Sequence, residues 1–302
     1  MPRWFEIFIT AAKNWSADNA FKHSAAVSFY TLFSLAPITL IAVGVAGFFF
    51  GEEVASRQFS TQITQLVGKE SAELIQKVVE AGAVEEKGWM KTALGIGLLV
   101  VGATTVFAQM QDSMNAIWGV TAKPSRSGWI VLLVQRLISF AMVLTIGFLL
   151  LTSLILSTAL TAAIHVTEVY WAVPPWVLRG VDLGLGLVVI TLLFALLFKV
   201  LPDVKVSWRE VWLGAFITAV LFSVGRLLIA MYLGYSTIAS AYGAAGSLVA
   251  LLMWIYFSCA ILFYGAEFIR AYRLSNGSPV VPKETAVRVR REIIEEPTKQ
   301  KA

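Results

Sequence analysis

The stretch AAVSFYTLFSLAPITLIAVGVAGFFF, residues 25–50, contains no charged residue. About 20 consecutive apolar residues in a helix are enough to cross the ~30 Å hydrocarbon core of a bilayer. A second stretch, residues 183–198, is also free of charge. These two stretches predict membrane-spanning helices, and apolar runs of similar length recur along the rest of the chain.

The composition agrees with a membrane protein. Of the 302 residues, 58% are hydrophobic and 14% charged, and the mean hydropathy is +0.75. Soluble domains are roughly 45–50% apolar and about 25% charged, so this chain has too few charges to cover a soluble surface. We predict an all-α, polytopic membrane protein with six transmembrane helices, at residues 25–50, 92–111, 130–164, 181–200, 211–233 and 246–269.

The third predicted span is unusually long. A helix over residues 130–164 would extend roughly 52 Å at about 1.5 Å per residue. No turn signal divides it, so we expect one long tilted helix.

The basic residues orient the bundle. Sixteen of the 24 Lys and Arg residues lie in the N-terminus, the second and fourth loops and the tail, whereas six lie in the other loops. Positively charged loops favour the cytoplasm, so both termini are expected there. Arg136 and Arg226 are the two that remain, and they lie within spans.

Three segments lie outside the predicted spans. Residues 1–24 form an amphipathic helix with Trp4, Phe8, Ala11 and Trp15 on one face. This helix either lies on the inner leaflet or packs on the base of the bundle. Residues 51–91 form an extracytoplasmic cap of two amphipathic helices with a net charge of −2, to which we assign no ligand. Residues 273–302 form a cytoplasmic charged tail, expected to be disordered or a short surface helix with weak attraction to anionic lipid.

The sequence gives no support for catalysis. The lone Cys259 lies within the sixth span, and His23 and His165 are expected on opposite sides of the bilayer. Phosphate-binding, dinucleotide-binding and zinc-protease motifs are missing from the sequence. We therefore predict no catalytic residues, no metal, no cofactor and no enzymatic activity.

The polar residues within the membrane are the candidate site, because a charge there needs a reason. Arg226 lies about two-thirds of the way across the fifth span, roughly 19 Å in depth from Glu267. We therefore expect Asp182 rather than Glu267 to be its partner. By the same reasoning Arg136 is expected on the cytoplasmic side, near Asp112 and Gln109 at the end of the second span. Each arginine either forms a structural ion pair or binds substrate. The candidate substrate-binding residues are Arg226, Arg136, Asp182, Asp112 and Gln109.

A second group of residues has a predicted structural or gating role. Pro37 is expected to kink the first span and free backbone carbonyls. The uncharged loop over residues 234–245 either re-enters the bundle as a gate or forms an exposed turn. Gly180-x-x-x-Gly184 is expected to let helices approach closely. The candidate gating residues are Pro37, Tyr242, Gly243, Gly246 and Glu267.

Several distinctive blocks of sequence lie in order over about residues 18–272. They are Ala25-Ala26-Val27-Ser28-Phe29-Tyr30-Thr31-Leu32-Phe33-Ser34-Leu35-Ala36-Pro37, Leu201-Pro202-Asp203 with Trp208-Arg209, Tyr242-Gly243-Ala244-Ala245-Gly246-Ser247, Trp254-Ile255-Tyr256 and Gly265-Ala266-Glu267. Together these blocks resemble the YihY/BrkB family of bacterial membrane proteins. The cap and the tail lie outside these blocks.

The resemblance implies a six-span protein of the bacterial inner membrane. The family has carried a ribonuclease label and has been linked to serum resistance and to envelope lipid traffic. A nuclease needs a carboxylate–metal cluster or a His-based acid and base, for which this sequence has only scattered residues. Two hypotheses remain: a transporter or flippase for an anionic envelope lipid, and a non-transporting scaffold for envelope assembly. The expected partners are membrane lipids and possible envelope-assembly proteins, without nucleic acid, and the oligomeric state is left open.

Overall fold

A computed structural model describes residues 3–51, 89–123, 175–235 and 246–289, with isolated helical positions at Ser60, Thr64, Glu73, Leu137, Ala141 and Thr145. The helices are α1 (Arg3–Ala17), α2 (Ala20–Phe50), α5 (Trp89–Ile117), α7 (Pro175–Val200), α8 (Trp208–Tyr235) and α10 (Gly246–Ser275). Two short strands, β1 (Val120–Ala122) and β2 (Ala286–Arg288), complete the described elements.

Five helices coincide with predicted spans. Within the described residues, three segments are long and apolar enough to cross a membrane: Leu183–Val200 in α7, Trp208–Tyr232 in α8 and Leu248–Ser275 in α10. The helices α2 and α5 cover two further predicted spans. Residues 130–164 and most of the cap at 51–91 fall outside the described residues. The count of six spans and the long third helix therefore stay predictions.

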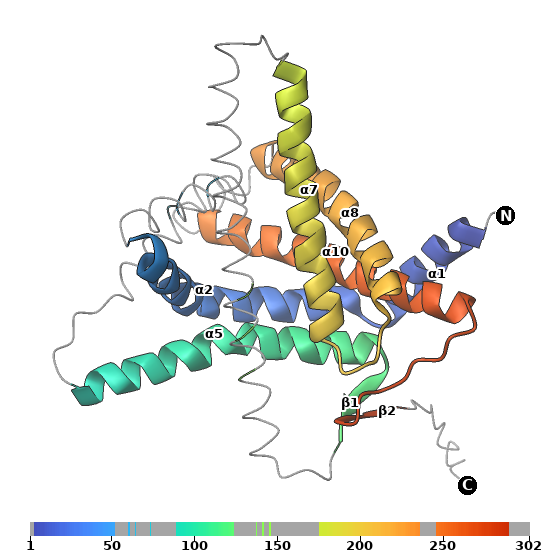
Figure 1. Cartoon of the computed structure of the whole chain (residues 1–302), viewed down its shortest axis with the longest axis horizontal. Helices are drawn as coiled ribbons and strands as arrows, with labels where there is room; N and C mark the ends of the chain where they lie inside the picture. Colours follow the sequence, from blue (N-terminus) through green and yellow to red (C-terminus); the bar gives the residue numbers. More distant parts are fainter. Residues whose placement is uncertain are drawn as a thin grey trace, which may run out of the picture.

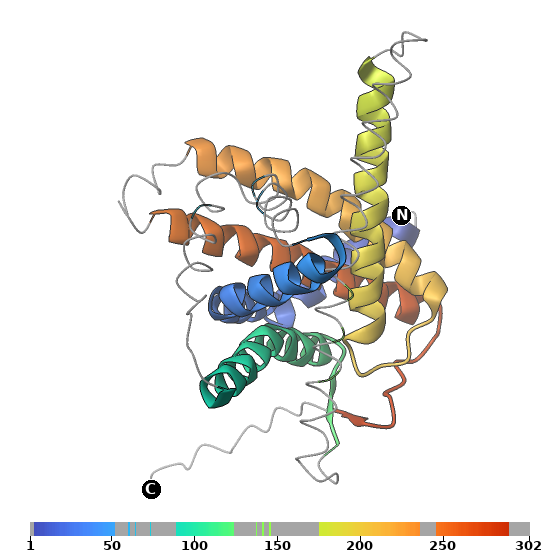
Figure 2. The same cartoon turned by 60° about the vertical axis from the view of Figure 1, so that its left-hand side comes forward.

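The described helices converge at one end and diverge at the other (Figures 1 and 2). α10 packs against α1, α2 and α8, while α2 also packs on α5 and α8 on α7. The N-terminal half of α7 runs away from α2 and α5 in both views. We call the converging end the base; it comprises residues 3–20, 111–123, 199–210 and 267–289. The predicted orientation places it in the cytoplasm.

Single glycines let α8 and α10 approach closely. A Cβ on Gly214 would overlap the side chain of Ile269, and a Cβ on Gly265 would overlap the Thr218 hydroxyl. A Cβ on Gly225 would lie 2.5 Å from Ile261 Cδ1. By contrast, no described atom lies within 4 Å of a Cβ built on Gly180 or Gly184. The close approach is therefore found at separate glycines opposite branched side chains, and the described structure gives the predicted Gly-x-x-x-Gly motif no such contact.

α1 packs on the base of the bundle against α10, whereas its place on the inner leaflet stays a prediction. The predicted apolar face lies against α10: Trp4 stacks on Tyr272 at 5.6 Å between ring centroids, and Phe8 lies 4.9 Å from Phe268. Ala11 on the same face is fully buried. Phe5, about 100° around the helix from Trp4, is exposed, so the contact with protein is confined to one face of α1.

The tail differs from its prediction. β2 pairs antiparallel with β1, with Val287 opposite Thr121, and an isolated bridge joins Val204 to Pro282. Expecting disorder or a surface helix there was wrong for residues 280–289, and an all-α fold needs correction for these two strands. The physical reason is that the backbone amides and carbonyls of the tail find partners in loops far away in the sequence. Lys283 N donates to Asp203 O at 2.8 Å in this way.

Candidate functional site

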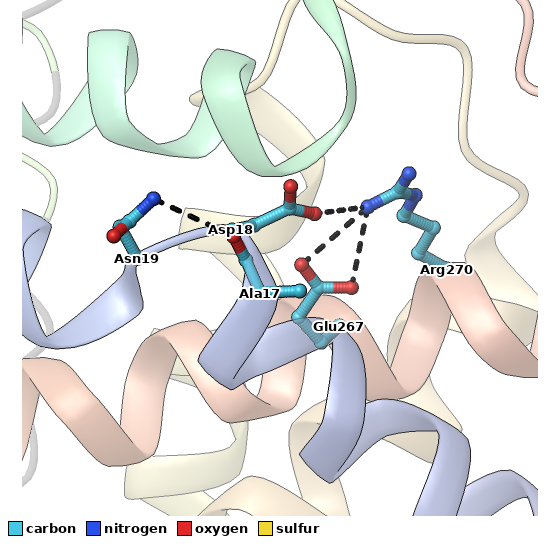
Figure 3. Close-up of polar contacts among 5 residues, drawn as sticks. All are labelled: Ala17, Asp18, Asn19, Glu267 and Arg270. Atoms are coloured by element: carbon cyan, nitrogen blue, oxygen red, sulfur yellow. Dashed lines mark hydrogen bonds and ion pairs between the residues drawn. The ribbon is translucent and has the colours of Figure 1, made fainter. Parts of the chain in front are cut away.

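The junction between α1 and α2 is joined to α10 by a cluster of three charged residues (Figure 3). Arg270 Nη1 lies 2.7 Å from Asp18 Oδ2 and 3.4 Å from Glu267 Oε2, so one guanidinium faces two carboxylates. Asn19, which follows Asp18, adopts left-handed backbone geometry with φ 57°, and the chain turns there from α1 into α2. Glu267 is fully buried. We call these three charged residues the latch.

A second polar network at the base centres on Asp203. Its carboxylate accepts hydrogen bonds from Asn115 Nδ2 at 2.9 Å and Gln111 Nε2 at 3.3 Å, and its amide donates to Asn115 Oδ1 at 2.8 Å. Nearby, Arg273 Nη1 pairs with Glu210 Oε2 at 2.7 Å. None of these contacts was predicted. The only sequence signal was Asp203 in a short loop, which reveals no partner.

Lys283 adds the tail to the same network. Its ammonium donates to Val200 O at 3.2 Å. Burial lowers the pKa of Lys283 below its ordinary value, the charge of Asp203 opposes this change, and Lys199 adds to it. The tail therefore places a partly desolvated cation at the C-terminal end of α7, beside Asp203.

A polar hollow of about 620 Å³ lies beside the latch, lined by residues that include Asp18, Asp112, Asn115 and Arg270. Asp112 lies one residue beyond the predicted span that ends at residue 111. Desolvation in the hollow, and then the charge of Asp203, raise the pKa of the Asp112 carboxyl. Among the residues that the structure describes, no group of three or more His, Cys, Asp or Glu side chains is arranged to hold a metal ion.

The predicted site around Arg136 is only partly visible. Arg136 is outside the described residues, so its predicted contacts with Asp112 and Gln109 stay predictions. Gln109 Nε2 lies 3.4 Å from Ser113 Oγ on its own helix. Asp112 instead faces the hollow next to Asp18.

Arg226 lies beyond an aromatic layer on the inner face of α8. One turn before it, Phe222 packs edge-on against Phe194 of α7 at 5.6 Å and Trp254 of α10 at 6.3 Å. Residues four apart share a helix face, so Arg226 continues the face of Phe222 towards the outer end. In the described part of the chain, no acidic side chain forms an ion pair with it.

The predicted pair of Arg226 with Asp182 stays a prediction, because the Asp182 side chain is not described. The Phe194–Phe222 contact sets the register of α7 against α8. Along the helices, Arg226 is about 6 Å beyond Phe222, whereas Asp182 is about 18 Å beyond Phe194. The register thus places the two backbones about 12 Å apart in height.

The predicted gating residues have different outcomes. α2 continues through Pro37 as one helix, although the Pro37 side chain is not described. Tyr242 and Gly243 lie outside the described residues, and Gly246 is the first residue of α10. Glu267 belongs to the latch and does not pair with Arg226. The difference in membrane depth between the two residues had predicted this.

An apolar groove of about 660 Å³ runs between α8 and α10. α8 contributes Leu221, Val224, Gly225, Leu228, Ile229 and Tyr232. These residues recur at helical spacing on one face, and Arg226 is not among the lining residues. α8 therefore presents an arginine on one side and a groove on another.

The family-level comparison fits the resemblance in the sequence. A family model described as virulence factor BrkB matches residues 11–287. The chain belongs to the BrkB family. Two of the BrkB-family blocks lie at the base, where Asp203 accepts bonds from α5 and Glu267 joins the latch.

Curated relatives of this BrkB-family chain are named membrane proteins. It is 29% identical over 257 residues to the UPF0761 membrane protein of Azotobacter vinelandii, covering 84% of this chain and 60% of that one. It is 24% identical over 265 residues to the UPF0761 membrane protein of Pseudomonas aeruginosa strain LESB58, covering 85% and 60%. The chain thus spans about 60% of the length of these relatives. No solved structure matches it. The protein is an integral membrane protein with apolar helices long enough to span a bilayer.

Proposed function

We propose that this protein is a transporter or flippase of the bacterial inner membrane for an amphipathic, anionic envelope lipid or its precursor. The observation that carries the proposal is the position of Arg226. It lies within a membrane-spanning helix, on the same face as the Phe222 layer, and no acidic side chain that the structure describes, Asp182 not being one of them, pairs with it. Ionisable residues inside membrane segments often mark substrate pathways.

A guanidinium at this place suits a phosphate-bearing headgroup. A guanidinium carries a positive charge and presents several N–H donors in a plane. Arg136, in the predicted third span, is the proposed counterpart at the cytoplasmic leaflet. The two arginines would attract the headgroup from opposite sides of the aromatic layer. Since the sequence has no nucleotide-binding motif, we propose passive, ion-coupled or partner-driven movement.

Liposomes that contain the purified protein test this proposal. We expect wild type to move a fluorescent anionic phospholipid between leaflets, and Arg226→Ala and Arg136→Ala to slow it about tenfold or more. Arg209→Ala is the matched control, because it removes the same charge from an exposed position in the first turn of α8. Wild-type rates in both membrane variants would refute the headgroup role. A wild-type rate equal to that of protein-free liposomes would refute transport.

The alternative function is a non-transporting scaffold for envelope assembly. Its support is the base, where ion pairs and the β1–β2 pairing join segments from both ends of the chain. Cross-linking in cells that express wild type, a variant ending at residue 289 or a variant without the cap at 51–91 tests it. A scaffold predicts that one truncation loses a specific cross-linked partner, and identical partner sets would refute this function.

A further inference from the structure

We propose that the groove between α8 and α10 binds one acyl chain of a lipid from the outer half of the bilayer, with the headgroup left outside next to Tyr232. This site deepens the proposed function, and it rests on that function only for its role in transport. Binding of the chain is a separate property with its own test.

The chemistry of the groove excludes a polar ligand. Its polar side chains include Trp15 and Tyr264, and both are already used within the protein. Trp15 Nε1 donates to Ala260 O at 3.0 Å, and the Tyr264 hydroxyl donates to Phe8 O at 3.3 Å. Apart from Tyr232 at the outer end, what remains is aliphatic and aromatic surface on α8 and α10, and a polar group placed against it would lose hydrogen bonds without replacement. A hydrocarbon chain has no such cost.

The length of the groove fits one acyl chain. The lining residues of α8 extend from Leu221 to Tyr232, about 16 Å along the helix, against about 15 Å for half of the hydrocarbon core. One chain of a lipid in the outer leaflet therefore matches the groove from end to end.

The two ends of the groove differ, and this sets the direction of the chain. At the end nearer the base, Trp15 and Phe21 pack 4.2 Å apart, and Phe21 stacks on Tyr256 at 6.3 Å. These rings offer only apolar surface to the methyl end of a chain. At the other end, Tyr232 lies near the end of α8 and is exposed. Tyrosines are enriched at membrane–water interfaces, where a headgroup lies.

The groove is open to the bilayer along its side. Val224 and Leu228 line it and are also exposed on the surface of α8. At Gly225 the absence of a side chain lets α10 come close through Ile261, which forms the floor. A chain can therefore enter sideways from the surrounding lipid without opening the base.

Electron paramagnetic resonance of the full-length protein in nanodiscs, with a phosphatidylcholine spin-labelled near the end of one chain, tests the site. We expect Leu228→Trp to fill the groove and to remove about one motionally restricted lipid per protein. Leu227→Trp is the matched control: Leu227 is 61% exposed and Leu228 60%, but only Leu228 lines the groove. Val224→Trp is a second variant that blocks the same groove and guards against a folding defect in the first.

The outcomes separate the two proposals. Loss of the restricted lipid in both groove variants and not in the control supports the site. An unchanged restricted population in both groove variants, or an equal loss in Leu227→Trp, overturns it. Intact binding together with absent lipid movement in wild-type liposomes overturns the proposed function alone.

The direction of the chain has its own measurement. Trp15 fluorescence, taken as the difference between wild type and Trp15→Phe, should be quenched more by bromines near the methyl end than by bromines near the headgroup. The reverse order would overturn the assignment to the outer half of the bilayer.

Discussion

The base and the outer halves of the helices are held together by different forces. At the base, charged and amide side chains join segments that are far apart in sequence: Arg270 reaches Asp18, and Asn115 reaches Asp203. In the outer halves of α7 and α8, large apolar side chains such as Leu183 and Leu227 are exposed. The helices converge in the first region and diverge in the second (Figure 2).

This difference determines which part can move. Breaking the base would leave buried carboxylates and amides without partners, which costs several kcal/mol in total. In a bilayer, apolar side chains gain little by leaving lipid for protein, so the outer halves can separate at low cost. We therefore expect the base to act as a fixed support and the outer halves to admit lipid.

The largest expected effect comes from breaking the latch. Arg270→Ala removes the guanidinium that faces fully buried Glu267 and partly buried Asp18, which costs about 3–5 kcal/mol. Thermal unfolding in detergent micelles measures the change. Arg209→Ala, at an exposed position, should change stability by less than about 0.5 kcal/mol. Equal stability of the two variants would contradict the claim that the latch holds the base.

The Asp203 network should have the next largest effect. Asn115→Ala removes one bond to the Asp203 carboxylate and one from its backbone amide, at a cost of about 2–3 kcal/mol. Gln109→Ala on the same helix is the matched control, because the one side-chain contact it removes among the described residues is weak, at 3.4 Å within α5. Chemical unfolding measures the free energy of unfolding of both variants. A similar loss in each would contradict the claim that the Asp203 network stabilises the base.

Glycine substitutions compare the two ends of the α8–α10 contact. A methyl group on Gly265 meets the Thr218 hydroxyl and comes within 2.8 Å of Phe198 Cζ, so Gly265→Ala should cost about 1–2 kcal/mol. At Gly225 the obstacle is Ile261 Cδ1, the end of a flexible side chain. Since alanine favours the helix by about 1 kcal/mol, Gly225→Ala should be near neutral. Equal thermal stability of the two variants would mean that both ends of the contact are packed alike.

The smallest expected effect is the pH dependence at Asp112. Its pKa is raised in the folded protein above the ordinary value of 3.8, so folding is favoured most when the carboxyl is protonated. The contribution of Asp112 to the free energy of unfolding should be complete below pH 3.8. It should be lost as the pH rises through the raised pKa of the folded protein. The melting temperature of Asp112→Asn minus that of wild type should therefore increase from acidic to neutral pH. A constant difference would contradict the raised pKa.

The sequence predicts much of the helical framework because apolar runs report directly on membrane burial. The runs at 181–200, 211–233 and 246–269 became α7, α8 and α10, each extended by several residues. The apolar face of α1 was also correct, because residues three and four apart share a side of any helix. These properties depend only on neighbours in the chain.

The candidate site was harder to predict. Arg226 could be recognised from the sequence as a charge in an apolar run. Its position beyond Phe222, and the finding that no described acidic side chain pairs with it, became known only from the packing of α7 against α8. Glu267 was recognised as unusual, whereas its partners Arg270 and Asp18 depend on how α1 turns back at Asn19. The groove has no sequence signal at all, because its two walls come from separate helices.

The sequence alone therefore determined that this is a helical membrane protein of the BrkB family and where most of its described spans lie. Only the tertiary structure decided that the tail forms a strand against residues 120–122 and that Asp203 is shared by α5. The physical reason is range. Hydrophobicity and helical periodicity act between neighbouring residues, whereas a hydrogen bond or ion pair between distant segments exists only after the helices have packed.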